Sequence, residues 1–353
     1  MVLLFPFRYH GFQPERKELA HLYTEDVTNF FSTLSKGLDN LEKAVSSDGL
    51  SFSFLGMAID LLRSTHSGAL LVTEKLRLPA SCKGEEWLNE YMDETVKLLD
   101  VCNVLKVGVS GLEHYQNLVD VAVRGLEAAI MFRHQGPRAM HALNACKQEM
   151  ARIENEHKIL MEHKIESEGR LTVNNLGDKH VENKFVKWNG FWGVLFAMKI
   201  TSSYICRLLL SAIVYAGPNP SLNFETVAVR VPWTNSLVRL QQRVNDEVSK
   251  TRNVRKCTTM LSHEMEFVET TLAEVRSHIP TSLRGPTLPL PNTEGLEKIR
   301  QRVSALKQLL QKFQTGVEAI DWHVNDLFDE IVEGRNKLLN IVNSSSSAER
   351  RIP

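Results

Sequence analysis

The chain has 353 residues, and its 42 lysine and arginine residues balance 42 aspartate and glutamate residues, so the formal net charge is zero. This balance argues against a dedicated nucleic-acid-binding protein, which usually carries a basic excess. Hydrophobic residues make up 43% of the chain and charged residues 24%, which is ordinary for a soluble globular protein and excludes bulk disorder. Glycine and proline are scarce, which favours long uninterrupted helices.

The N-terminal segment, Met1 to Phe12, is apolar but lacks the basic start of a signal peptide, and Pro6 and Arg8 interrupt it. Acidic residues follow from Glu15 on, which disfavours a transit peptide. We therefore expect a cytoplasmic protein whose N-terminal segment packs on the body as an apolar strap. The five cysteines are scattered, so we expect reduced, buried thiols and no disulfide framework or zinc site.

The first half of the chain shows helical spacing of apolar residues in four stretches. Ser46 to Gly49 ends the first, Pro79 closes the second, and Gly108 and Gly111 are potential breaks in the third. The predicted helices cover residues 17–44, 51–77, 85–133 and 138–166.

A polar linker at 169–179 precedes the second half, and we keep a subdivision of the domain near 167–180 as an alternative to a single domain. A fifth helix is predicted over 181–215, and two very long helices over 233–279 and 296–342. Four prolines lie between the long helices, so we expect them to fold back as an antiparallel hairpin. The sequence thus predicts an all-α fold. It forms one elongated bundle of about six to seven long helices over residues 1–343, with a disordered tail at 344–353.

The most apolar stretch, residues 188–216, is long enough to cross a bilayer. Lys199 and Arg207 lie inside it, each costing roughly 2.5–3.5 kcal/mol near a membrane centre. Ser203 lies between them on the same side of the helix. We therefore expect a buried bundle helix with one polar edge, and keep a single membrane span and peripheral membrane contact as alternatives.

Sequence motifs for common chemistry are missing. No Gly-x-Gly and no Gly-Lys-Ser/Thr occurs, so neither a dinucleotide fingerprint nor a P-loop is present, and no Gly-x-Ser-x-Gly elbow is found. Glu18-x-x-His21 and Glu154-x-x-His157 have the spacing of di-iron ligands. With twelve histidines such pairs arise by chance, so we predict no metal site, no cofactor and no catalytic residue.

The segment Glu86–Asn103, EWLNEYMDETVKLLDVCN, resembles the signature of the plant BYPASS family and of relatives that bind an exocyst subunit. The residues that fit the family pattern include Trp87, Tyr91, Asp93, Asp100 and Cys102. Three other blocks resemble the family in the same order: Leu50–Pro79 with Thr65-His66, Pro232–Val248, and Gly316–Val342 with its Gly-Arg-Asn.

This resemblance implies a non-enzymatic plant regulator of growth that acts through protein–protein interaction. Family members are implicated in restraining a root-derived mobile signal that arrests shoot growth, and relatives are tied to exocyst-mediated secretion. The family has no established catalytic residues, so Trp87 and Tyr91 are interpreted as packing residues and Asp93 as a polar anchor. The alternatives are an exocyst-linked adaptor, a membrane-anchored scaffold, and an enzyme with an unrecognised site for an apolar metabolite. Periodicity leaves the oligomeric state open.

Overall fold

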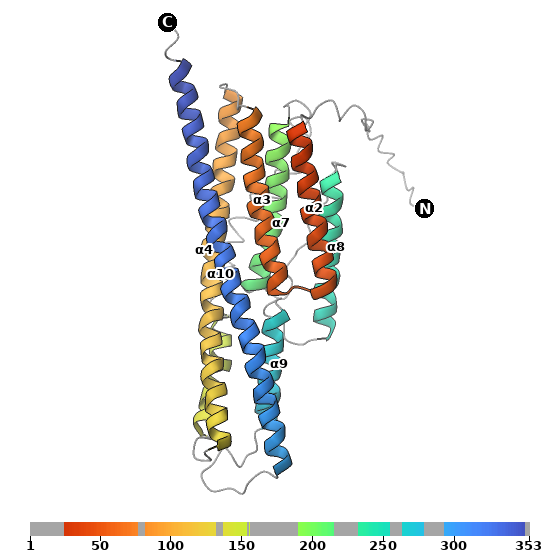
Figure 1. The fold of residues 1–353 in the computed structure, drawn as a ribbon, viewed down its shortest axis with the longest axis vertical. Coiled ribbons are helices and arrows are strands. Elements are labelled where there is room, and N and C mark those ends of the chain that lie inside the picture. Colours follow the sequence, from red (N-terminus) through yellow and green to blue (C-terminus); the bar gives the residue numbers. More distant parts are fainter. Residues whose placement is uncertain are drawn as a thin grey trace, which may run out of the picture.

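The computed structural model describes residues 25–76, 82–131, 137–153, 155, 190–214, 232–254, 263–278 and 293–349. Almost all of these residues are helical, and none of them lies in a strand. The helices run along one axis and form an elongated bundle (Figure 1), which confirms the all-α prediction. Besides a helical segment at 137–153, the elements are α2 (Glu25–Asp48), α3 (Phe52–Leu76), α4 (Cys82–Met131), α7 (Phe191–Ile213), α8 (Pro232–Val254), α9 (His263–His278) and α10 (Thr293–Glu349).

The connection between α2 and α3 follows the predicted stop and start signals. Gly49 adopts a left-handed conformation with φ 63°, and its N–H donates to the Val45 carbonyl at 3.1 Å. Such a glycine satisfies a terminal carbonyl of the preceding helix. Ser51 caps the next helix, because its Oγ accepts a hydrogen bond from the Phe54 N–H at 3.2 Å. Residues 17–24, predicted as the first turns of α2, lie outside the described residues.

Helix α4 is unbroken over 50 residues, so neither Gly108 nor Gly111, the two potential breaks or kinks, ends the helix. Gly108 is buried where α4 passes the end of α7. A Cβ at this position would come within 2.7 Å of Val214 Cγ2 and 3.1 Å of Ile213 Cγ2. The glycine therefore serves close helix packing, and the surrounding contacts outweigh its low helix propensity of about 1 kcal/mol.

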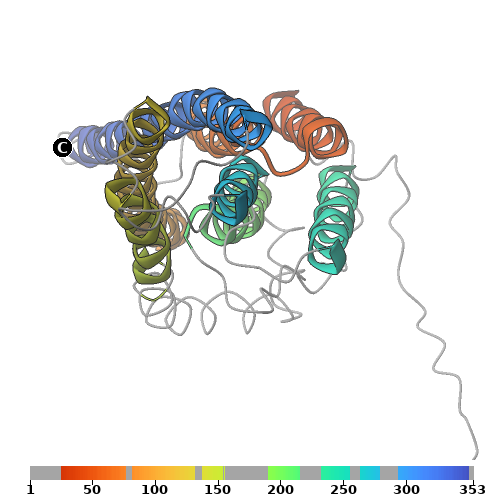
Figure 2. The same cartoon turned by 90° about the horizontal axis from the view of Figure 1, so that it is seen from below.

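Helix α7 begins at Phe191, after Gly190 with φ 90°. The prediction that one helix runs from residue 181 through Gly190 is therefore wrong, because a left-handed residue interrupts helical hydrogen bonding. Residues 181–189 themselves lie outside the described residues. Viewed along the bundle, α7 lies in the interior, with α10, α3 and α2 on one side (Figure 2), and it contacts α2, α3 and α4.

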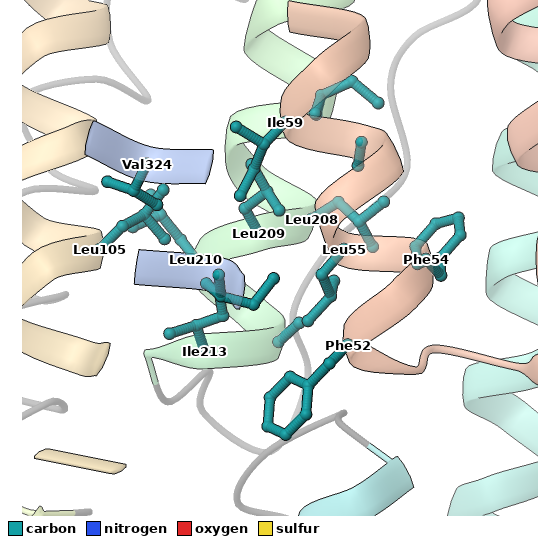
Figure 3. Packing of buried hydrophobic residues seen from close by; sticks show 14 of the residues in the cluster. Phe52, Phe54, Leu55, Ile59, Leu105, Leu208, Leu209, Leu210, Ile213 and Val324 are labelled. Atoms are coloured by element: carbon teal, nitrogen blue, oxygen red, sulfur yellow. The ribbon is translucent and has the colours of Figure 1, made fainter. Parts of the chain in front are cut away.

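The core is built where α3, α4, α7 and α10 meet (Figure 3). Leu55 and Ile59 of α3 lie near Leu209 of α7, while Leu105 of α4 faces Val324 of α10. All five side chains are at most 1% exposed. Burying each aliphatic side chain of this kind stabilises the fold by roughly 1.5–3 kcal/mol. The bundle therefore has a filled apolar interior along α7.

The predicted helix 233–279 is not one helix, because α8 packs against α2 whereas α9 packs against α10 (Figure 1). The apolar series jumps from Val248 to Val254 and then to Leu261, gaps too wide for one continuous seam. Residues 255–262 between the two helices lie outside the described residues. The antiparallel hairpin therefore consists of α9 and the first part of α10, and Arg302 forms an ion pair with Glu274 across it.

Helix α10 extends for 57 residues to Glu349, so residues 344–349 of the predicted disordered tail are helical backbone. Adding residues to an existing helix costs little compared with starting one, which explains why the serine run continues α10. Residues 350–353 lie outside the described residues. The proposed linker and subdivision at 167–180 lie outside them as well, so the single-domain prediction is not tested there.

Candidate functional site: a buried aromatic and histidine junction

Residues from three of the family-like blocks meet in the bundle interior. Trp87 and Tyr91 come from α4, His66 from α3, and the Gly334-Arg335 pair from α10. Helical spacing places Trp87 and Tyr91 four residues apart on one side of α4. We call these five residues the junction. Its members are separated by up to 269 positions in the sequence, so only the packing of the three helices brings them together.

The aromatic rings of the junction form a continuous stack. The Trp87 and Tyr91 rings lie 5.4 Å apart at an interplanar angle of 12°, and the Tyr91 and His66 rings lie 5.4 Å apart at 22°. The indole Nε1–H of Trp87 donates to the Phe191 carbonyl at the start of α7 at 3.0 Å. Because Trp87 is 1% exposed and Tyr91 is fully buried, the stack fastens α4 to α3 and to α7.

A hydrogen bond of 2.9 Å joins the Tyr91 hydroxyl to His66 Nε2. Burial lowers the pKa of His66 to about 4, while Glu330 raises it and Arg335 lowers it to smaller extents. Burial also raises the pKa of Tyr91 well above its usual value. Both rings are therefore neutral at pH 7. The Nδ1 atom of His66 is buried and has no hydrogen-bond partner among the described residues.

Arg335 ties α10 to the backbone of α4. Its guanidinium donates to the Met92 carbonyl at 2.7 Å and also to the Thr95 hydroxyl. Thr95 is itself buried, and its hydroxyl donates to the same Met92 carbonyl at 2.9 Å. Both bonds from Arg335 come from the same nitrogen, Nη1. Arg335 thus fixes the axial position of α10 along α4.

Gly334 allows α10 to approach the junction closely. A Cβ at this position would collide with Leu70 Cδ1 and would lie 3.1 Å from His66 Nε2 and 3.6 Å from the Tyr91 hydroxyl. Gly334 is buried in the middle of a long helix, where alanine would be preferred by propensity alone. Two residues of the Gly-Arg-Asn in the closing block therefore have structural roles. Gly334 leaves space for the Leu70, His66 and Tyr91 side chains, and Arg335 forms hydrogen bonds to α4.

Polar contacts between α3 and α10 share one register. Four pairs connect the outer sides of these two parallel helices, and in each pair the two residues are 263 positions apart. The pairs are Asp60–His323 at 3.2 Å, Arg63–Asp326, Ser67–Glu330, and Glu74–Lys337 at 3.0 Å. Partly exposed pairs of this kind contribute little stability, about 0–1 kcal/mol each, so their main effect is to set the alignment of α10 on α3.

The structure separates the remaining predicted residues from the junction. Asp93 and Asp100 lie on the exposed side of α4, whereas Cys102 is buried. Burial raises the pKa of the Cys102 thiol to about 12, so the side chain is a protonated packing residue. The role of Asp93 as a polar anchor stays a prediction, for a carboxylate that lies on the exposed side of α4. His66 and Arg335 were parts of recognised blocks, but their meeting with Tyr91 could not be inferred from spacing.

The Pro232–Val248 block joins the bundle at a separate place. Trp233 is fully buried at the start of α8, with its ring 6.3 Å from that of Phe196. Arg239 forms ion pairs with Asp39 at 2.5 Å and with Glu42 at 3.0 Å, both on α2. This block therefore fastens α8 to α2 and α7 and does not reach the junction.

The polar edge predicted for the apolar stretch is present on α7. Lys199, Ser203 and Arg207 are half-buried, and the Lys199 ammonium pairs with Glu90 at 3.2 Å. By length and composition α7 could cross a membrane, but 78% of its apolar window is buried inside the bundle. Its surroundings are those of a core helix.

The described residues contain no group of three or more His, Cys, Asp or Glu side chains placed to hold a metal ion. The two Glu-x-x-His pairs of the sequence, Glu18 with His21 and Glu154 with His157, lie outside the described residues. The junction itself offers a neutral imidazole and a neutral phenol enclosed by aromatic rings. Its chemistry is that of a helix-packing contact, in which the Tyr91 hydroxyl and His66 Nε2 bond to each other.

Comparison with known proteins places the chain in a plant family. A family model described as Protein ROH1-like matches residues 10–184 and 194–342. Protein BPS1, chloroplastic, of Arabidopsis thaliana is 26% identical over 326 residues, which cover 91% of this chain and 85% of that protein. Protein ROH1D of the same plant is 21% identical and is aligned over 94% of this chain and 92% of its own length.

A rice relative, UPF0496 protein 4 of Oryza sativa subsp. japonica, is 25% identical over 72% of this chain, and the match spans about half (54%) of its length. No solved structure matches the chain. The family match covers the helices of the bundle except the first three residues of α7 and the last seven of α10, and it includes the blocks that meet at the junction. The chain therefore belongs to the ROH1-like family and is a BYPASS-related protein, as its sequence blocks indicate.

Proposed function

We propose that this protein is a non-enzymatic regulator of plant growth that restrains a root-derived mobile signal and works through protein–protein interaction. The observation that carries the proposal is the similarity to BPS1 over 91% of the chain. The junction supports it, because its buried polar groups are engaged in holding helices together. A bundle locked in this way is suited to presenting a fixed surface to a partner.

The outer side of α4 is the surface that we assign to the partner. Exposed residues recur there at alternating steps of three and four, which is the spacing of a helix-on-helix seam. Val96 and Val107 are 46% and 54% exposed on this side, and Asp93 and Asp100 flank Val96. We expect a partner helix with an apolar seam and basic flanking residues. This assignment gives Asp93 and Asp100, the exposed acidic residues beside Val96, a role in binding.

Complementation of Arabidopsis seedlings that lack BPS1 tests the proposal. The wild-type chain is expected to relieve shoot arrest, and a variant with Asp93→Lys and Asp100→Lys is expected to fail although it accumulates as a soluble protein. The matched control carries Asp246→Lys and Glu318→Lys, two exposed carboxylates on α8 and α10, and should rescue as the wild type does. A wild-type chain that is present and soluble but gives no rescue would contradict the role in this signal.

An exocyst-linked adaptor in secretion is the second candidate, and it rests on the resemblance of the Glu86–Asn103 block to relatives that bind an exocyst subunit. Binding of the purified chain to an exocyst subunit, together with failed complementation, would favour it. A membrane-anchored scaffold is less well supported because α7 is a core helix. Release of the protein by alkaline carbonate would exclude an integral span.

We also propose a cytoplasmic location. The printed name of BPS1 places that relative in the chloroplast, so the chloroplast is the alternative compartment for this chain. A carboxy-terminal fluorescent fusion in leaf cells would separate the two compartments, and fluorescence confined to chloroplasts would contradict the proposal.

A further inference from the structure

A groove of about 360 Å³ runs between the first turns of α2 and the second half of α3. Its floor is formed by buried apolar side chains of both helices, among them Phe30, Leu34 and Leu61. Gly68 lets the Phe30 ring pack closely against α3, since a Cβ there would lie 3.2 Å from that ring. Leu71 stands at the edge with 52% of its surface exposed. The groove is therefore an apolar recess that is open along the outside of the bundle.

Polar side chains line the edges of this groove. Asn29 and Thr33 are exposed on consecutive turns of α2, and Ser64 faces them from α3. The Ser64 hydroxyl donates to the Leu61 carbonyl at 3.1 Å and keeps its lone pairs for an incoming donor. An apolar floor between rows of donors and acceptors suits an extended peptide, whose backbone N–H and C=O groups need partners along both edges.

We propose that the groove binds the N-terminal apolar segment of the same chain, Val2 to Phe7. The groove reaches the first turn of α2 at Asp26, and the 24 residues that precede α2 join the helix at that end. From Leu61 to Lys75 it follows 14 residues of helix, about 21 Å. Six residues in extended conformation span about 20 Å, which matches this length.

The composition of the segment fits the groove. In an extended chain Leu3, Phe5 and Phe7 share one side, so three large apolar side chains would enter the recess together. Seventeen residues separate Phe7 from Glu25, enough to turn back and reach any part of the groove. A second copy of the folded protein is a poorer occupant, because a stable dimer buries about 800 Å² on each partner and this recess is narrow.

Photochemical cross-linking of the full chain tests the proposal. The photoreactive analogue p-benzoylphenylalanine replaces Phe5, and irradiation is expected to give cross-links within one chain to peptides covering residues 26–34 and 61–75. The same analogue at position 267, where Phe267 is exposed on α9, should give no cross-link to these peptides, because α9 packs against α10. Cross-links from position 5 to other parts of the bundle, or none, would overturn the proposal.

A pair of surface variants separates groove binding from non-specific contact. Leu71→Asp places a charge at the edge of the groove and is expected to lower the cross-link yield at least five-fold. Val121→Asp changes an equally exposed valine on α4, 57% exposed, and should leave the yield unchanged. Equal yields in the two variants would contradict the assignment. Cross-links that form only between two chains, or only to another protein, would assign the groove to a different occupant.

Discussion

Tyr91 of α4 and His66 of α3 contact each other twice, through a hydrogen bond of 2.9 Å between the hydroxyl and Nε2 and through stacking of their rings at 5.4 Å. Both side chains are at most 1% exposed. Buried polar groups cannot form hydrogen bonds with water, so the Tyr91 hydroxyl and His66 Nε2 each need the other as a hydrogen-bond partner. Two of the blocks that define the family-like pattern are thus physically coupled at this point.

The first prediction concerns the Tyr91 hydroxyl. Tyr91→Phe removes it and leaves both ring nitrogens of His66 without a partner among the described residues, since Nδ1 already lacks one. An unsatisfied buried group costs about 1–3 kcal/mol, so we expect the free energy of unfolding to fall by that amount. Urea denaturation followed by circular dichroism measures it.

A double-mutant cycle provides the control for this prediction. Replacing both partners, with His66→Leu and Tyr91→Phe, removes the imidazole together with the hydroxyl. The double variant should therefore lose less stability than the sum of the two single variants. Additive losses would show that the hydrogen bond does not couple the two residues.

The second prediction concerns Gly334. Gly334→Ala places a methyl group against Leu70 and 3.1 Å from His66 Nε2, so α10 must move away from α3 or the side chains must rearrange. Overpacking of this kind costs about 1–3 kcal/mol. Replacing glycine by alanine in a helix gains about 1 kcal/mol of propensity, so the cost is larger than the gain over nearly the whole range. We expect net destabilisation in thermal and urea unfolding.

Gly125→Ala is the matched substitution on α4. A Cβ there would lie 3.4 Å from Ala139 Cα, an ordinary contact distance. This variant should be as stable as the wild type or more stable, because it gains propensity without overpacking. Destabilisation of Gly125→Ala but not of Gly334→Ala would refute the steric role assigned to Gly334.

The helical architecture could be predicted because it depends on local signals. The stop at Gly49 and the start at Ser51 were visible in residue types that act over one turn, and the apolar spacing of α10 extends over most of its length. The wrong assignments depended on neighbours. Gly108 does not break α4 because α7 packs against it. Gly190, which was predicted to lie inside a helix, adopts a left-handed conformation, and a Cβ there would lie 2.7 Å from Val27 Cγ2.

The junction could be predicted only in pieces. The large rings of Trp87 and Tyr91 indicated packing, and Thr65-His66 and Gly-Arg-Asn were recognisable as parts of blocks. Nothing in the spacing of one helix says that His66 is stacked on Tyr91 or that Arg335 reaches the Met92 carbonyl. The constant separation of 263 residues between α3 and α10 likewise becomes visible only after the helices are aligned.

The third prediction is a loss of stability in mild acid. The pKa of His66 is lowered from 6.5 to about 4 in the folded protein, so between these values the unfolded chain binds a proton that the folded chain does not. Protons therefore favour unfolding, and stability falls as the pH falls from 6.5 towards 4. The full shift corresponds to roughly 3 kcal/mol as an upper value.

Urea midpoints measured at pH 7 and at pH 4.5 test this sign for the wild type and for His66→Gln. The variant keeps a polar side chain near Tyr91 but has no group that titrates in this range. Its midpoint should fall less on acidification than that of the wild type, and the difference between the two proteins isolates His66 from the other histidines. An identical fall would show that His66 does not cause the pH dependence.

The fourth prediction concerns the buried thiols. Cys102, Cys146 and Cys206 are free and buried, and burial raises the pKa of Cys102 to about 12 and that of Cys146 to about 11. A thiol reacts with iodoacetamide as the thiolate. At pH 7.5 low accessibility therefore protects all three residues, and the raised pKa also protects Cys102 and Cys146. Native protein should leave all three unmodified for hours, as read from tryptic peptides by mass spectrometry. Labelling should become complete in 8 M urea.

Gly334→Ala should speed labelling of Cys102, because opening α10 from the junction raises the population of locally unfolded molecules. Rapid modification of Cys102 in the native wild type would contradict the sealed core at α4.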